Sequence, residues 1–313
     1  MFESLAWTGL LAFAAVCGAA TTASPSAIAH NYSLTTSTHL PFPTASLSNS
    51  DTKSYLTSSW PIYDKTIDDA EDISFVTDPF PSGASDSKSP VLRVTYGKGS
   101  YSEGGGGAQF TALWNPSGNE KFQSMLVTYE VAFDIDFDWV KGGKLPGIRG
   151  GPKENGCSGG NAADGSNCFT SRVMWRTDGA GEVYSYFLTP DKLCDNKNFE
   201  CHSDGYGTSI DRGSFSFVAG QWNRVTMLVR LNNPLDTANG QVALYHNNVE
   251  AINQDILQYR NSDDVYISGF FFSLQEVIHL MPRRRKCTHT SATSKCGGAL
   301  RPPNWMQCYA CEG

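Results

Sequence analysis

The chain has 313 residues, of which 40% are hydrophobic, and its formal net charge is −7 at neutral pH. This length and composition suffice for one large hydrophobic core, and all-β domains of this size often fold as a single unit. The acidic balance argues against nucleic acid as a partner, but it does not exclude a locally basic cleft that binds a polyanion.

The first 58 residues are predicted to precede the folded domain. Residues 1–20 combine an apolar run with small residues at its end, which is typical of a secretory signal peptide, although the only charge near the start is Glu3. The run is too short to predict a membrane span. Residues 21–58 are rich in Ser, Thr and Pro, which predicts a disordered, O-glycosylated segment. Asn31 begins an N-glycosylation sequon, and the sequence alone favours neither a glycosylated asparagine nor an unused triplet.

From about residue 73 the sequence alternates strand-like runs with turns rich in Gly, Asn and Asp. The predicted strands are VLRVTYG, GAQFTAL, MLVTYEVAFDIDF, SRVMWRT, EVYSYFL, SFSFV, NRVTMLVRL, QVALYHN and VYISGFFFS. Convincing amphipathic helices are missing from the pattern. Residues 59–273 are therefore predicted to form an all-β domain, a jelly roll or two-sheet sandwich with a concave cleft.

Four cysteines lie at short spacing in loop-like segments, in the order Cys157, Cys168, Cys194 and Cys201. In a secreted chain this spacing predicts two local disulfides, Cys157–Cys168 and Cys194–Cys201. A zinc site is the less favoured alternative, because suitable histidines and Cys-x-x-Cys spacing are missing from these segments.

The segment SRVMWRTDGAGEVYSY, residues 171–186, predicts a hairpin with a polar face. Strand alternation places Arg172 and Arg176 on one face of the first strand, and Glu182, Tyr184 and Tyr186 on one face of the second. If TDGAG closes the hairpin, Arg172 lies near Tyr186, and Arg176 forms a structural ion pair with Glu182. An ordinary solvated sheet face explains the arginine and the tyrosines equally well at this point.

A basic segment, DWVKGGKLPGIRGG, precedes the hairpin and contributes Lys141, Lys144 and Arg149. Its Gly and Pro content predicts a loop, which is either a solvated turn or one wall of a groove lined by Lys, Arg and Tyr without a histidine. This set of residues suits β-elimination at a uronic acid. Arg or Lys neutralises the carboxylate so that the C5 proton becomes removable. A tyrosine whose pKa is lowered by nearby cations then acts as the base, and as the acid toward the O4 leaving group.

The motifs KGGKLPG, CFTSRVMWR and GAGEVYSY together closely resemble the alginate lyases of polysaccharide lyase family 14 and their fungal relatives, including glucuronan lyases, over roughly residues 75–273. The resemblance implies a jelly-roll cleft with Lys144, Arg172, Tyr184 and Tyr186 as catalytic residues. Thr170 takes the place of a family serine.

From the resemblance we expect a secreted, monomeric lyase that acts on an anionic polysaccharide of the alginate or glucuronan type. Lys141, Arg149 and Arg176 join Thr170 as candidate substrate-binding residues. No cofactor is expected to be required, whereas a structural calcium ion is left open.

Residues 274–313 break the alternation of the domain and carry four cysteines among basic residues. One interpretation is a small metal module with ligands among His279, Cys287, His289, Cys296, Cys308 and Cys311. The favoured interpretation is a frame error or misplaced splice junction after about Ser273, because a two-base shift permits Gly-Gly-His-Ser-Pro-Tyr-Ala, close to the family's next strand. In that case the strand that closes the sheet is missing.

Two other functions remain open at this level. FDIDFDW places Asp134, Asp136 and Asp138 on one strand face, a pattern that resembles the paired carboxylates of jelly-roll glycoside hydrolases. A jelly roll that binds a carbohydrate without turnover would use the same groove.

The frame-error hypothesis predicts that the transcript departs from the reading frame of this chain near codon 273. Sequencing the transcript across codons 260–313 tests it. An intact in-frame message that encodes this tail would contradict the hypothesis.

Overall fold

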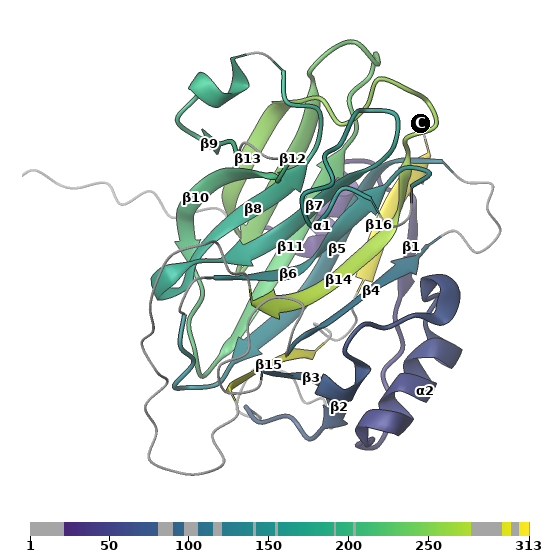
Figure 1. The fold of residues 1–313 in the computed structure, drawn as a ribbon, viewed down its shortest axis with the longest axis vertical. Coiled ribbons are helices and arrows are strands. Elements are labelled where there is room, and N and C mark those ends of the chain that lie inside the picture. Colours follow the sequence, from purple (N-terminus) through teal and green to yellow (C-terminus); the bar gives the residue numbers. More distant parts are fainter. Residues whose placement is uncertain are drawn as a thin grey trace, which may run out of the picture.

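The computed structural model confirms the all-β prediction, because antiparallel strands dominate the part of the chain that it describes (Figure 1). The described residues are 22–80, 90–96, 106–114, 121–139, 142–153, 156–190, 192–202, 205–276, 296–301 and 307–312. The predicted signal peptide, residues 1–20, lies outside these ranges. None of the described helices is long and apolar enough to cross a membrane.

The described strands join into one curled sheet. They are β1 (Thr36–His39), β2 (Ile73–Val76), β3 (Val91–Tyr96), β4 (Ala108–Leu113), β5 (Phe122–Phe133), β6 (Gly143–Gly150), β7 (Phe169–Trp175), β8 (Ala180–Tyr186), β9 (Phe199–Glu200), β10 (Thr208–Ser216), β11 (Trp222–Arg230), β12 (Gly240–His246), β13 (Val249–Leu257), β14 (Ile267–Glu276), β15 (Cys296–Arg301) and β16 (Gln307–Glu312). The helices are α1 (Pro25–Asn31) and α2 (Asn49–Ser59), with short 3-10 turns η1 (Tyr63–Lys65), η2 (Ala70–Asp72), η4 (Thr177–Gly179) and η5 (Leu193–Asp195).

The sheet has two halves that face each other across one core. The strand order is β13-β12-β11-β5-β14-β6-β7-β8-β10-β9, and β5 meets β14 through the single pair Phe122 and Ile267. Fully buried side chains from both halves, such as Met227 on β11 and Val173 on β7, belong to the same hydrophobic cluster. Tyr129 on β5 also reaches across and donates a hydrogen bond of 2.9 Å from its hydroxyl to a carbonyl oxygen on β6. The result is the sandwich that the alternation predicted.

Residues 22–58 are ordered, so the prediction of disorder for residues 21–58 is wrong for the part that the structure describes. Ser48 caps the N-terminus of helix α2, because its hydroxyl accepts a hydrogen bond from the Asp51 amide. The helix buries Leu56 fully and lies beside β2 (Figure 1). Ile28 of α1 is also buried, in a cluster with side chains of β5, β11 and β12. A few large apolar side chains at the right positions outweigh the polar average of the segment. Asn31, the sequon residue, is exposed.

The basic segment before the hairpin is a central strand rather than a loop. β6 pairs with β14 on one side and β7 on the other, with a register shift between Leu145 and Gly147. Its glycines reflect close approach: a Cβ on Gly143 would lie 2.0 Å from the Trp175 ring. A Cβ on Gly147 would lie 2.0 Å from a carbonyl oxygen of β7. Glycine therefore permits the pairing here, although the same residues usually indicate a turn.

The C-terminal segment contributes backbone pairing beyond Ser273. β14 continues to Glu276, β15 pairs with β3 and β5, and β16 pairs with β1 and β5. The described tail residues thus extend the sheet beside β5. His279, Cys287 and His289 lie outside the described residues, and the frame-error hypothesis stays a prediction about the transcript.

A half-buried histidine, His246, gives the fold a testable pH dependence. Burial lowers the pKa of His246 from 6.5 to about 4. The unfolded chain therefore takes up a proton below pH 6.5 that the native protein does not bind until about pH 4, so stability falls as the pH drops through this window. On acidification from pH 7 to pH 4.5 the wild type should lose on the order of 2 kcal/mol of unfolding free energy through His246, a figure already reduced for solvent screening. His246→Gln should not show this loss.

Urea unfolding at pH 7 and pH 4.5 measures this effect. His30→Gln, at an exposed position of α1, controls for the loss of a histidine as such. An identical pH dependence in the wild type and in His246→Gln would contradict the assignment.

Candidate active site

β7 and β8 form the predicted hairpin, but their register differs from the predicted one by two residues. Arg172 pairs with Tyr184, and Thr170 pairs with Tyr186. The turn is shorter than TDGAG, because the Arg176 amide already donates to the Ala180 carbonyl at 2.7 Å. An even shift keeps every side chain on its predicted face, so the polar face survives the error.

The predicted ion pair between Arg176 and Glu182 is confirmed. Nε of Arg176 donates to the Glu182 carboxylate at 2.9 Å, and Nε of Arg212 donates to its other oxygen at 2.6 Å. Glu182 is fully buried between the two arginines, so this cluster is structural support. It also holds the Arg176 guanidinium 5.9 Å from the centre of the Tyr184 ring.

The guanidinium of Arg172 is the central feature of the polar face. Arg172 is fully buried, and its three side-chain nitrogens have no hydrogen-bond partner among the described residues. The guanidinium carbon lies 4.9 Å from the centre of the Phe271 ring and 5.9 Å from that of Tyr186. Burial lowers the pKa of Arg172 to about 10, against the opposing influence of the two tyrosines. An unpaired cation that is buried in this way carries a desolvation cost, which pairing with an anion would offset.

A lateral row of pairs explains how Arg172 meets Phe271. Phe271 on β14 pairs with Gly147 on β6, and Gly147 pairs with Arg172 on β7. Gly147 therefore lies between the two residues in the pairing, and the Arg172 guanidinium carbon lies 4.9 Å from the Phe271 ring centre. The row continues from Arg172 to Tyr184 on β8.

The two tyrosines stand next to each other with their rings nearly perpendicular, 5.7 Å apart at the centres. The Tyr184 hydroxyl accepts a hydrogen bond of 3.0 Å from the Gly207 amide, and the Tyr186 hydroxyl accepts one of 3.3 Å from the Gly160 amide. Burial raises the pKa of Tyr184 above its usual value, because it outweighs the influence of Arg172. The prediction of a lowered tyrosine pKa is therefore wrong for Tyr184.

Lys144 lies on the same face as the arginine and the tyrosines. It is half-buried on β6 and pairs with Met174, the residue two positions beyond Arg172 on β7. The structure thus brings Lys144, Arg172, Tyr184 and Tyr186 onto one face of three adjacent strands. Lys141 lies outside the described residues.

Thr170 and Arg149, both predicted to bind substrate, use their polar atoms within the protein. Thr170 is fully buried, and its hydroxyl donates to the Cys157 carbonyl at 2.7 Å. Arg149 is 1% exposed and donates to the Ser268 hydroxyl at 3.1 Å and to the Lys153 carbonyl at 2.9 Å. In this structure both side chains are buried and hydrogen-bonded within the protein.

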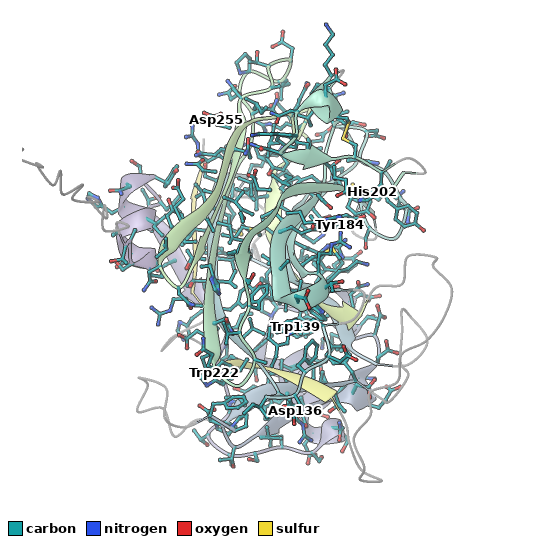
Figure 2. All side chains as sticks on the ribbon, turned by 90° about the vertical axis from the view of Figure 1, so that its left-hand side faces the viewer. Asp136, Trp139, Tyr184, His202, Trp222 and Asp255 are labelled. Atoms are coloured by element: carbon teal, nitrogen blue, oxygen red, sulfur yellow. A yellow bond between two sulfur atoms is a disulfide. The ribbon has the colours of Figure 1, made fainter. Side chains whose placement is uncertain are left out.

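His202 stands beside Tyr184 with its ring centre 6.2 Å from that of the tyrosine (Figure 2). The prediction of a groove without histidine is therefore wrong. His202 follows Cys201, and β9 pairs with β10, which brings this loop to the hairpin. The cysteine spacing indicated a closed loop, but only the strand pairing shows what the loop approaches.

Both predicted disulfides, Cys157–Cys168 and Cys194–Cys201, are confirmed. Within the described ranges no group of three or more His, Cys, Asp or Glu side chains is arranged to hold a metal ion.

Comparison with known families identifies the relationship. The model of polysaccharide lyase 14 matches residues 84–274, which include every strand of this site and more than half of the chain. The chain belongs to polysaccharide lyase family 14. No curated protein sequence matches it.

Solved structures agree with this assignment to the family. The alginate lyase of Aplysia kurodai is 27% identical, with a TM-score of 0.65, and the match covers 87% of this chain and 100% of that one. The alginate lyase from Chlorella virus is 16% identical, with a TM-score of 0.60 over 86% of this chain and 99% of that one. Similarity extends to an alginate lyase in complex with an alginate tetrasaccharide, at 17% identity and a TM-score of 0.57 over 90% of this chain and 98% of that one.

Membership of a polysaccharide lyase family excludes the glycoside hydrolase interpretation. The geometry agrees, because β5 ends at Phe133 and the three aspartates follow in a turn in which the Phe137 amide donates to the Asp134 carbonyl. Asp134 and Asp136 are exposed there instead of lining one strand face.

The contrast between two buried arginines gives a prediction for stability. Replacing a buried, unpaired cation by an apolar side chain of similar length removes a desolvation cost, so Arg172→Met should raise the free energy of unfolding by about 1 to 3 kcal/mol. Arg149→Met leaves two hydrogen-bond acceptors without their donor and should lower it by about 1 to 3 kcal/mol. Urea unfolding of both variants measures the difference, and equal destabilisation would contradict our account of Arg172.

Proposed function

We propose that this polysaccharide lyase cleaves a polyuronate of the alginate type by β-elimination. The observation that carries the proposal is the buried Arg172, which lacks a hydrogen-bond partner among the described residues and adjoins two tyrosines. The similarity to the Aplysia kurodai alginate lyase supports the choice of polymer.

In the proposed mechanism Arg172 binds the carboxylate of the uronate at the cleavage site. A guanidinium neutralises this carboxylate through two parallel hydrogen bonds, and the partly dehydrated surroundings strengthen the interaction. Neutralisation makes the C5 proton removable, because the negative charge that develops at C5 spreads onto the carboxyl group. Lys144, on the same face, adds a second positive charge.

The two tyrosines handle the protons on either side of the elimination. Tyr184 has a raised pKa and keeps its proton, which suits it to protonate O4 as the C4–O4 bond breaks. Tyr186, as the phenolate, takes the C5 proton first; the electron pair of the C5–H bond forms the C4–C5 double bond as the electron pair of the C4–O4 bond leaves with O4. The Gly160 amide and the Arg172 guanidinium stabilise negative charge on the Tyr186 oxygen.

We further propose that the enzyme acts outside the cell as a monomer and requires no cofactor. The two disulfides support an oxidising compartment, as does the apolar, small-residue pattern of residues 1–20. A secretory route also makes glycosylation at the exposed Asn31 feasible.

Tyr184→Phe and Tyr186→Phe test the proposed roles. Each should lower kcat on alginate by at least about 100-fold with a much smaller effect on binding, because each removes one proton transfer. Absorbance of the unsaturated product, followed with alginate, glucuronan and a neutral β-glucan, measures turnover. Tyr63→Phe, at a residue outside the site that is 40% exposed, is the matched control.

Several outcomes would contradict the proposal. Wild-type protein that releases reducing ends without new absorbance would be a hydrolase, and protein that binds without product would be a carbohydrate-binding module. Unchanged turnover in both tyrosine variants would contradict the assigned roles even if alginate is cleaved.

A further inference from the structure

Thr170 occupies the position next to Tyr186, yet its hydroxyl points to a loop. The two residues are direct partners across β7 and β8. Thr170 is fully buried, and the hydrogen bond of 2.7 Å from its hydroxyl ends on the carbonyl oxygen of Cys157. A residue in this position connects the sheet to the segment that begins at Cys157.

That segment, residues 157–168, is a loop closed by the disulfide between Cys157 and Cys168. It is also fixed internally, because the Asp164 carboxylate accepts hydrogen bonds from the amides of Ser166 and Asn167, each at 2.8 Å. Both cysteines are fully buried and pack in one cluster with Met174, Tyr184 and Tyr186. The closed loop therefore rests directly on the proposed catalytic side chains.

The loop returns one backbone donor to the site. The Gly160 amide, three residues after Cys157, donates to the Tyr186 hydroxyl at 3.3 Å. Gly160 has a φ of +86°, a conformation that glycine adopts without strain. Among the described residues, Arg172 on β7 and Tyr184 on β8 are charged or titratable groups beside Tyr186. The loop thus supplies one backbone donor to the Tyr186 oxygen, the atom that takes the C5 proton in the proposed mechanism.

We propose that Thr170 is a positioning residue, which acts through the Cys157 carbonyl and the closed loop to hold the Gly160 amide against the Tyr186 hydroxyl. This inference rests on the proposed function, because it takes Tyr186 as a proton-transfer group. It replaces direct substrate binding as the role of Thr170. A serine at this position would serve the same purpose, since only the hydroxyl makes the contact.

The test compares Thr170→Val, Thr170→Ser and Thr226→Val. Thr170→Val keeps the shape and removes the hydroxyl, whereas Thr170→Ser keeps the hydroxyl. Thr226 on β11 is a matched control, because it is also buried and its hydroxyl lies 2.9 Å from that of Thr128 on β5. Thr170→Val should lower kcat on alginate about five- to tenfold with KM within twofold, which corresponds to one lost hydrogen bond. Thr170→Ser should restore kcat.

Hydrogen–deuterium exchange at the Gly160 amide gives a readout that does not depend on activity. Exchange should accelerate about five- to tenfold in Thr170→Val and also in Tyr186→Phe, which removes the acceptor. It should stay at the wild-type rate in Thr226→Val and Thr170→Ser.

Two results would overturn the inference. One is a rise in KM at constant kcat in Thr170→Val, which would identify a substrate contact. The other is unchanged exchange at Gly160 in Thr170→Val. If the wild type cleaves no polyuronate, the proposed function fails, and the exchange comparison still decides whether Thr170 holds the loop.

Discussion

The fold accommodates one unfavourable feature on which the site depends, the buried guanidinium of Arg172. Removing an unpaired cation from water costs several kcal/mol even after relaxation, and the described residues offer it no hydrogen-bond acceptor. The rings of Phe271 and Tyr186 compensate in part, as cation–π contacts of about 1 to 2 kcal/mol in a desolvated setting. The hydrophobic core between the two halves of the sheet must supply the remainder. We interpret this cost as stability given up in order to bind a carboxylate.

Contacts around Arg172 hold the backbone in the conformation that buries its guanidinium. Gly147 lets the backbone of β6 approach the backbone of β7 closely at Arg172, and the Tyr129 hydroxyl donates to the Pro146 carbonyl from the opposite half of the sheet. The loop closed by Cys157 and Cys168 adds a backbone donor for the neighbouring tyrosine. Side chains from both halves of the sheet, together with one loop, therefore hold the Arg172 guanidinium and the Tyr186 hydroxyl in place.

Strand alternation accounts for what could be predicted. The face shared by Arg172, Tyr184 and Tyr186 follows from a period of two, and it survived a register error because that error was even. The strand β6 could not be predicted, since its Gly and Pro content indicates a turn unless the close approach of Trp175 is known. His202 was missed because only the pairing of β9 with β10 brings it to the site. The raised pKa of Tyr184 reflects burial, which residue types alone do not reveal.

In the proposed mechanism Arg172 receives the carboxylate of a uronate. The most direct measurement follows the Nε–H resonance of Arg172 by NMR in the Tyr186→Phe variant, which should bind substrate with little turnover. The account predicts that an alginate oligosaccharide shifts this resonance on saturation, whereas a neutral glucose oligosaccharide of equal length does not. An unchanged resonance at saturating alginate oligosaccharide, or the same shift with the neutral one, would contradict the account.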